Sequence, residues 1–257
     1  ANEFEMSESY PVSGQTYPRK ADSRILNALS AIAQSAYRFA DDMRLLQHMR
    51  EVEEPFEKNQ IGSSAMAYKR NPMRSERICS LSRYVITNSQ NAANTAATQW
   101  LERTLDDSAN RRISLPEGFL TIDAVLNLLI NVTGGLVVYP KVIEKNLMEF
   151  LPFLATENLL MSAVKAGGDR QEMHELIRKH SMDSAAQMKL EGKECDLLSR
   201  LANDDAFILD KEQIDSALNP HDYVGRAPQQ VTEYLNEFVY PTLKANEFEK
   251  VNAQVDV

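Results

Sequence analysis

Residues 62–72 read Gly62-Ser63-Ser64-Ala65-Met66-Ala67-Tyr68-Lys69-Arg70-Asn71-Pro72 and lie between two stretches that favour helix. The run carries hydroxyls, a Lys and an amide but no helical hydrophobic period, so it predicts a loop between two rigid helices, a common place for chemistry. Asn71 and Pro72 predict a helix start, with Asn71 as the N-cap. Lys69 and Asn71 beside a helix N-terminus suit a carboxylate or a developing oxyanion. On spacing alone, a solvated loop in which Asn71 only caps the helix is the simpler interpretation.

A long helix is predicted before the loop, over residues 22–49, with Asp22 or Ser23 as its cap. Apolar residues recur there every three or four positions and form one stripe suited to burial. The predicted stripe consists of Ile25, Leu29, Ile32, Ala36, Phe39, Met43 and Leu46. Residues 72–103 predict a second helix, whose many alanines let neighbouring helices approach closely. A third helix is predicted from a start signal at Ser114 to a stop at Gly134.

The expected fold class is all-α: a long-helix bundle over residues 1–138, followed by a smaller all-helical C-terminal domain over residues 139–257. The boundary is expected between Gly134 and Pro140. In the second domain the pattern predicts shorter helices near residues 140–151, 156–166, 169–191, 194–202, 210–218 and 227–239. Asp169 is the predicted cap of the third of these.

Composition limits the partners that the chain can bind. A net charge of −9 argues against broad binding to nucleic acid or to a membrane surface. A small anionic substrate therefore needs a local cluster of Arg and Lys. Cys79 and Cys195 lie far apart and lack metal-ligand spacing, which predicts reduced thiols in the cytoplasm. The most apolar run, residues 120–138, contains Asp123 and other polar residues and does not predict a membrane span, and no signal peptide is visible.

The 62–72 run resembles the signature loop of the fumarase/aspartase superfamily, G-S-S-x-M-P-x-K-x-N-P, whose members eliminate fumarate from a succinyl group. Two further runs, Met-Arg-Ser-Glu-Arg at 73–77 and Glu-Arg-Thr-Leu-Asp-Asp-Ser-Ala-Asn-Arg-Arg at 102–112, resemble the adenylosuccinate lyase family in particular. Argininosuccinate lyases and fumarases share the loop but not the 102–112 run. The likeness extends to residues 14–17 and 225–227. Ala67 stands where the pattern has Pro, which implies a looser loop when empty.

The resemblance implies cleavage of a C–N bond. Fumarate would be released from adenylosuccinate and from the succinyl-carboxamide ribotide of purine biosynthesis, without a metal or an organic cofactor. Ser63 matches the family's base, whose alkoxide needs positive charge nearby. Lys69 and Asn71 match groups that supply this and stabilise the doubly charged intermediate. Glu76 matches the carboxylate that supports a catalytic histidine.

Further positions match residues that bind substrate in the family. They are Gln15, Arg77, Arg103, Ser108 and Arg112, of which the last three grip the nucleotide phosphate. Guanidinium forks suit phosphate oxygens because they donate two parallel hydrogen bonds. The alternative is structural: Arg77 is a solvated helix charge, and the other arginines pair with the acidic residues Glu102, Asp106 and Asp107.

The resemblance also implies a homotetramer in which three subunits build each active site, and the small-residue seam favours pairing between copies. The family's general acid is a histidine from a region that precedes this chain's first residue. None of the chain's own histidines lies in a matching motif: His48, His174, His180 and His221. The chain is therefore expected to correspond to roughly the C-terminal half of the enzyme and to be inactive alone. Another fumarate-releasing lyase, such as an argininosuccinate lyase, and a non-catalytic helical assembly module remain alternatives.

Overall fold

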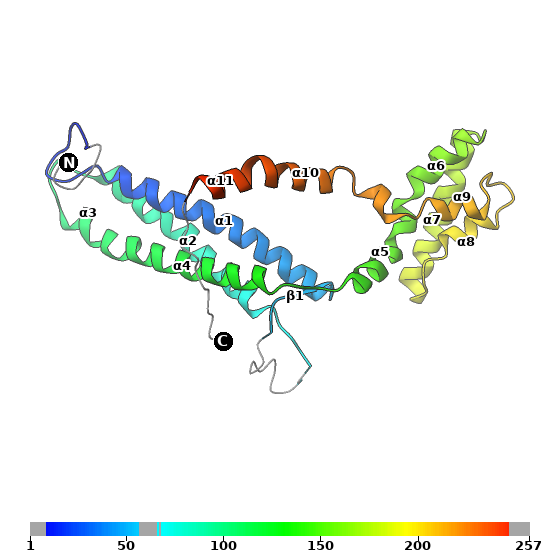
Figure 1. Cartoon of the computed structure of the whole chain (residues 1–257), viewed down its shortest axis with the longest axis horizontal. Helices are drawn as coiled ribbons and strands as arrows, with labels where there is room; N and C mark the ends of the chain where they lie inside the picture. The colour runs from blue at the N-terminus through cyan, green and yellow to red at the C-terminus, as the bar shows by residue number, and fades with distance from the viewer. Residues whose placement is uncertain (1–8, 57–65, 67, 247–257) are drawn as a thin grey trace. The chain divides into compact units, whose positions relative to one another are not determined.

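The computed structural model describes residues 9–56, 66 and 68–246, and their structure is almost entirely helical. The all-α expectation is thereby confirmed. The described chain divides into two compact units, one reaching Tyr139 and the other starting at Pro140 (Figure 1). The predicted boundary, between residues 138 and 139, lies one residue away from this division.

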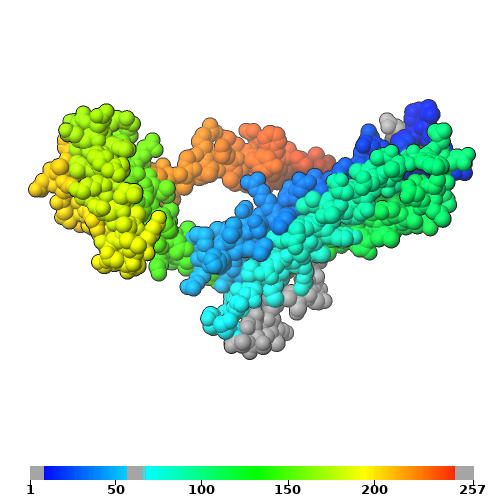
Figure 2. Space-filling view, turned by 180° about the vertical axis from the view of Figure 1, so that it is seen from behind, coloured from blue at the N-terminus to red at the C-terminus, as the bar shows by residue number. Residues whose placement is uncertain are grey.

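The first unit is a bundle of three long helices. α1 (Lys20–His48), α2 (Met73–Thr98) and α4 (Arg111–Gly134) pack side by side along most of their length (Figures 1 and 2). The short α3 (Leu105–Ala109) connects α2 to α4. β1 (Val52–Glu53) pairs antiparallel with β2 (Val137–Val138), which ties the segment after α1 to the segment after α4.

The core of this bundle runs along α1 with heptad spacing, and the predicted stripe is partly wrong. Leu29, Ala36 and Met43 are buried as expected, but Ile25 and Ile32 are 41% and 42% exposed. The other buried positions on this face are Leu26, Ala33 and Ala40. Alternating steps of three and four residues make a narrow seam, and its alanines allow α2 and α4 to approach closely. The prediction placed the large isoleucines in the stripe instead of these small residues, because isoleucine is the more strongly apolar.

Helix starts also differ from the prediction. α1 begins at Lys20 with Arg19 in the N-cap position, so Asp22 and Ser23 lie buried within its first turn. α4 begins at Arg111 rather than at Ser114, because the Asn110 carbonyl already accepts hydrogen bonds from the next turn. Ser114 is therefore inside the helix, where its carbonyl accepts a hydrogen bond of 2.6 Å from the Asn88 side chain.

The second unit contains α5 (Pro140–Leu154), α6 (Thr156–Lys165), α7 (Arg170–Glu191), α8 (Leu197–Ala202) and α9 (Lys211–Ser216). Its core is formed mainly by leucines and other large apolar residues of α6 to α9. Asp169 caps α7 as predicted, since its carboxylate accepts the backbone N–H groups of Gln171 and Glu172. A 3-10 turn (Pro220–Tyr223), α10 (Ala227–Tyr234), a π-helical segment (Leu235–Val239) and α11 (Tyr240–Ala245) complete the unit.

Candidate active site

The predicted site residues lie at opposite ends of the three-helix bundle. We call residues 47–56 and 68–77 the loop end, and residues 14–22 and 99–112 the arginine end. α2 spans the distance between them: its 26 residues rise by about 1.5 Å each, which makes the helix about 39 Å long. One copy of the chain therefore does not bring the two groups together. Ser63, the predicted base, lies outside the described residues.

The start of α2 at the loop end differs from the prediction. Pro72, not Asn71, occupies the N-cap position, and no side chain of the N-cap residue caps the helix. Glu54 takes this role from the other side of the loop. Its Oε1 accepts the Arg74 N–H at 2.9 Å, and its Oε2 accepts the Ser75 N–H at 3.0 Å and the Ser75 hydroxyl at 3.1 Å. The open helix N-terminus expected beside Lys69 and Asn71 is thus already occupied by a carboxylate.

Other polar contacts tie the residues before position 57 to those after position 67. The Gln47 amide donates to the Arg70 carbonyl and accepts the Glu54 N–H, both at 3.3 Å. The Arg70 guanidinium pairs with Glu53 at 2.9 Å. Glu53 also accepts the Tyr139 hydroxyl at 2.9 Å, and this hydrogen bond raises the pKa of Tyr139. The base of the signature loop is therefore a connected polar cluster.

A polar cleft of about 400 Å³ opens between the last turns of α1 and the first turn of α2. Asn71 and Glu76 line it together with Arg44, His48 and other residues of the loop end. Lys69 is exposed and does not line the cleft, and its ammonium forms no ion pair with any residue that the structure describes. The cleft thus offers an amide, a carboxylate, a guanidinium and an imidazole to a polar ligand. Arg77 is exposed nearby on α2.

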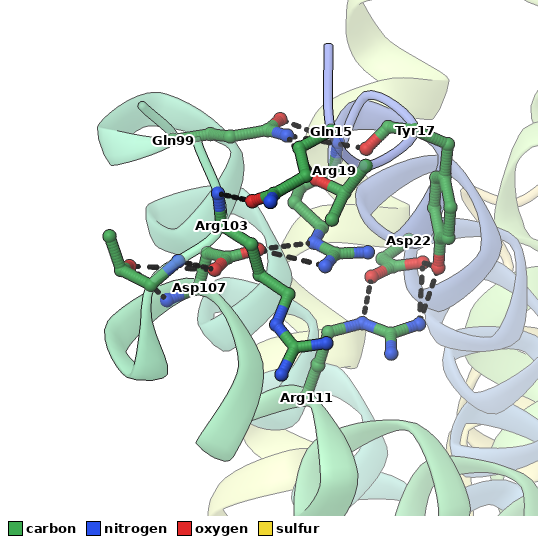
Figure 3. Close-up of polar contacts among 10 residues, drawn as sticks. Gln15, Tyr17, Arg19, Asp22, Gln99, Arg103, Asp107 and Arg111 are labelled. Atoms are coloured by element: carbon green, nitrogen blue, oxygen red, sulfur yellow. Dashed lines mark hydrogen bonds and ion pairs between the residues drawn. The ribbon is translucent and has the colours of Figure 1, made fainter. Parts of the chain in front are cut away.

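Two ion pairs organise the arginine end (Figure 3). Arg19 contacts Asp107 at 2.8 Å, with both side chains almost fully buried. Burial opposes ionisation of this carboxyl, but the hydrogen bond from the Thr104 backbone and the Arg19 guanidinium together hold the pKa of Asp107 below its usual value. Arg111 contacts Asp22 at 2.7 Å, and the Tyr17 hydroxyl donates to the same carboxylate at 2.6 Å.

Gln15 is held beside Arg103 by close backbone packing. Its side-chain oxygen accepts the Arg103 N–H at 2.9 Å (Figure 3). Gln99 bridges the same two segments, because its oxygen accepts the Arg19 N–H at 2.7 Å and its amide donates to the Tyr17 carbonyl at 3.2 Å. A Cβ on Gly14 would lie 2.6 Å from the carbonyl oxygen of Leu101, so only glycine fits there without a backbone shift.

Two guanidinium groups at this end are available to a ligand. Arg103 and Arg112 are exposed, and among the described residues neither pairs with Glu102, Asp106 or Asp107, because Asp107 is taken by Arg19. The ion pairs that the structural alternative predicts for these two arginines are thus absent from the described residues. The Ser108 hydroxyl is buried and has no hydrogen-bond partner in the described part of the chain. Two exposed guanidinium groups without an acidic partner among residues 9–56, 66 and 68–246 suit a phosphate.

Sequence reasoning missed the residues that hold these groups in place. Glu54, Arg19 and Arg111 were not singled out, and Asp22 was considered only as a cap of the first helix. Glu54 meets Arg74 from 20 positions away, and the two ion pairs Arg19–Asp107 and Asp22–Arg111 join residues 88 and 89 positions apart. No local pattern marks such a contact. By contrast, Asp169 accepts a hydrogen bond from a backbone N–H only two residues further on, and its capping role was predicted.

Comparisons with known proteins assign the chain to a family. The family described as "Lyase" matches residues 5–87, and "Adenylosuccinate lyase C-terminus" matches residues 152–234. Adenylosuccinate lyase of Saccharomyces cerevisiae is 54% identical over 235 residues, which are 91% of this chain and 49% of that protein. Adenylosuccinate lyase of Schizosaccharomyces pombe is 51% identical over 234 residues, 91% of this chain and 48% of that protein.

Solved structures show the same fold. The 3-carboxy-cis,cis-muconate lactonizing enzyme from Pseudomonas putida matches with a TM-score of 0.71 and 21% identity, over 86% of this chain and 47% of that one. A fumarate lyase from Mesorhizobium sp. BNC1 matches with a TM-score of 0.68 and 20% identity, over 85% and 47%. The chain belongs to the adenylosuccinate lyase family of the fumarase/aspartase superfamily, and it spans about half the length of the curated relatives it matches.

Proposed function

We propose that this chain supplies two parts of an active site that splits adenylosuccinate into AMP and fumarate, and that acts likewise on the succinyl-carboxamide ribotide. The observation that carries the proposal is a pair of arginines, Arg103 and Arg112, that form no ion pair within the described part of the chain and lie in a run typical of adenylosuccinate lyases. These arginines and Ser108 would hold the nucleotide phosphate, because a guanidinium matches phosphate oxygens with two parallel hydrogen bonds. Gln15 and Arg77 would contact other parts of the substrate.

The chemistry is assigned to the loop end. Ser63 would remove the proton beside a carboxylate of the succinyl group, leaving a carbanion whose charge spreads into that carboxylate. Lys69 and Asn71 would favour the Ser63 alkoxide and stabilise the doubly charged intermediate. Because Glu54 already occupies the start of α2, the main cation in this arrangement is the Lys69 ammonium. Glu76 would orient the histidine that protonates the departing nitrogen.

Assembly follows from the length of the bundle. The two ends lie about 39 Å apart along α2, so we propose that a site takes its loop end and its arginine end from different copies of the chain, in a homotetramer. Large apolar side chains suitable for burial between copies are exposed on α1 and α4. They are Ile25, Ile32, Leu45, Ile113, Phe119, Leu120, Leu126 and Ile130. We propose that these side chains are buried between copies, as exposed apolar patches at interaction sites are.

The same apolar surface explains one further property of the bundle. Residues 105–134 are long and apolar enough to cross a membrane by length and composition alone. One face of α4 is nevertheless packed in the core with α1 and α2, and we propose that other copies, not lipid, cover the rest. We also propose a cytoplasmic location, consistent with the free thiols of Cys79 and Cys195.

The proposal can be tested with a yeast hybrid, in which this chain replaces the part of the S. cerevisiae adenylosuccinate lyase that it matches. Fumarate release is measured with adenylosuccinate and with argininosuccinate. We expect activity with the first only, and loss of phosphate-dependent affinity in Arg112→Ala but not in the surface control Arg178→Ala. Activity with argininosuccinate would favour the alternative that the chain is part of an argininosuccinate lyase.

The 257-residue chain by itself is proposed to be inactive, because it spans about half of its relatives' length. The isolated wild-type chain should still bind adenylosuccinate, and its Arg112→Ala variant should bind this nucleotide more weakly. If the hybrid is inactive and neither protein binds the nucleotide, the alternative of a non-catalytic assembly module is favoured. Fumarate release by the isolated chain, at a rate near that of the yeast enzyme, would contradict the proposed inactivity.

A further inference from the structure

Glu54 joins the two sides of the signature loop. It precedes residues 57–67, and among the described residues its carboxylate accepts three hydrogen bonds from Arg74 and Ser75, which follow them. Both oxygens of the carboxylate are used, and Glu54 is only 5% exposed. Ser75 is fully buried. The contact is therefore a fixed part of the fold rather than a solvated pair.

This carboxylate determines where the first turn of α2 begins. The residue in the N-cap position, Pro72, has no side-chain acceptor, so the N–H groups of Arg74 and Ser75 in the first turn of α2 depend on Glu54. Asn71 and Glu76 lie directly before and within this turn, and both line the polar cleft. A change in the turn therefore moves both side chains. Residues that hold reacting groups in a fixed geometry influence rate more than binding.

We propose that Glu54 is a positioning residue for the elimination reaction, acting through the first turn of α2 on Asn71 and Glu76. The inference rests on the proposed function. Glu54 does not touch the substrate. Its role is to fix the positions of the Asn71 amide and the Glu76 carboxylate relative to each other in the cleft. Gln47, which bonds to the Glu54 N–H and to the Arg70 carbonyl, supports the same arrangement from α1.

The first measurement concerns the contact itself. Glu54→Gln keeps the size of the side chain but replaces one acceptor oxygen with an NH2 group, which cannot accept a backbone N–H. Hydrogen exchange at the Arg74 and Ser75 amides of the full chain should become at least about tenfold faster. Ser75→Ala is a milder second variant, since it removes only the hydroxyl donor. Unchanged exchange in Glu54→Gln would overturn the inference.

The second measurement separates positioning from stability. In the yeast hybrid, Glu54→Gln should lower kcat by about 10- to 100-fold and change KM by less than about threefold. Ser75→Ala should lower kcat by about two- to fivefold. Asp169→Ala is the matched control: it also removes a carboxylate that caps a long helix, but in the second unit. It should lower thermal stability and leave kcat within about twofold of wild type.

The outcomes separate this inference from the proposed function. If the parent hybrid lacks activity while amide hydrogen exchange at Arg74 and Ser75 is still faster in Glu54→Gln, this result would contradict the proposed function, and with it any effect of the Glu54 contact on catalysis. An active parent whose kcat is unaffected by Glu54→Gln would overturn the inference alone. Equal kcat losses in Glu54→Gln and Asp169→Ala would also overturn it, because they would reduce Glu54 to a stabilising cap.

Discussion

Mixing two impaired variants tests the proposed division of the active site between copies of the chain. Lys69→Ala removes the cation at the loop end, and Arg112→Ala removes a guanidinium at the arginine end. Each variant of the yeast hybrid should be severely impaired on its own. Loss of a group that stabilises the intermediate costs about 10²- to 10³-fold in kcat, and loss of a phosphate contact raises KM by about 10- to 100-fold.

The expected recovery follows from the geometry of the bundle. Lys69 precedes α2 and Arg112 follows it, and the helix between them is about 39 Å long, so a site that uses both residues would take them from different copies. If equal amounts of the two variants assemble at random, half of the copies carry Lys69 and half carry Arg112. A site then has both residues in about one quarter of cases, which predicts about 25% of wild-type activity for a closed symmetric assembly.

The assay measures fumarate release after the two purified variants are dissociated together and reassembled. As a control, each variant alone is dissociated and reassembled in the same way, and it should show no recovery of fumarate release. The double variant Lys69→Ala/Arg112→Ala, mixed with wild type, should retain about one quarter of the activity as well, because its sites follow the same statistics. If the mixed single variants recover nothing, although native mass spectrometry shows mixed assemblies, both residues act within one copy and the geometric reasoning is refuted.

Three further predictions concern the bundle. Asp107 has a lowered pKa in the fold, so its stabilising effect is present above its unfolded pKa of about 3.9 and is lost as the pH falls through the folded value; Asp107→Asn should cost about 1.5–3 kcal/mol at pH 7 and flatten the dependence of the urea-unfolding free energy between pH 5 and pH 3. Gly14→Ala should raise KM for adenylosuccinate with little change in kcat, because it shifts the segment that holds Gln15; a normal KM would contradict the close packing on Leu101. Ala36→Leu should destabilise the bundle by about 1–3 kcal/mol through overpacking, whereas Ile32→Ala should leave unfolding nearly unchanged in the monomer and weaken assembly, as measured by sedimentation.

The sequence predicts the helices well because their signals are local. The periodic apolar residues of α1, the stop at Gly134 and the cap at Asp169 each involve neighbours within a few positions. The α1 stripe was partly wrong because alanine carries a weak apolar signal, although Ala33 and Ala40 form the seam. The residues of the candidate site were found from short runs that match a family, not from their surroundings.

The parts that could not be predicted depend on distant contacts. Glu54 reaches the start of α2 from across the signature loop, and Arg19 meets Asp107 from 88 positions away. Nothing in a charged run such as 51–54 indicates which carboxylate will be buried. The motifs also do not reveal that α2 separates the loop end from the arginine end, since that follows only once the length and direction of the helix are known.

The central claim is that a serine at the loop end starts the elimination, and one comparison tests it most directly. In the yeast hybrid, Ser63→Ala and the neighbouring Ser64→Ala are compared by single-turnover fumarate release from adenylosuccinate, with nucleotide binding measured in parallel. We expect Ser63→Ala to lose activity by at least about 10³-fold while it still binds substrate, because no other group in this arrangement replaces the base. We expect Ser64→Ala to stay within about tenfold of wild type, on the same reasoning. Substantial fumarate release by Ser63→Ala would contradict the account.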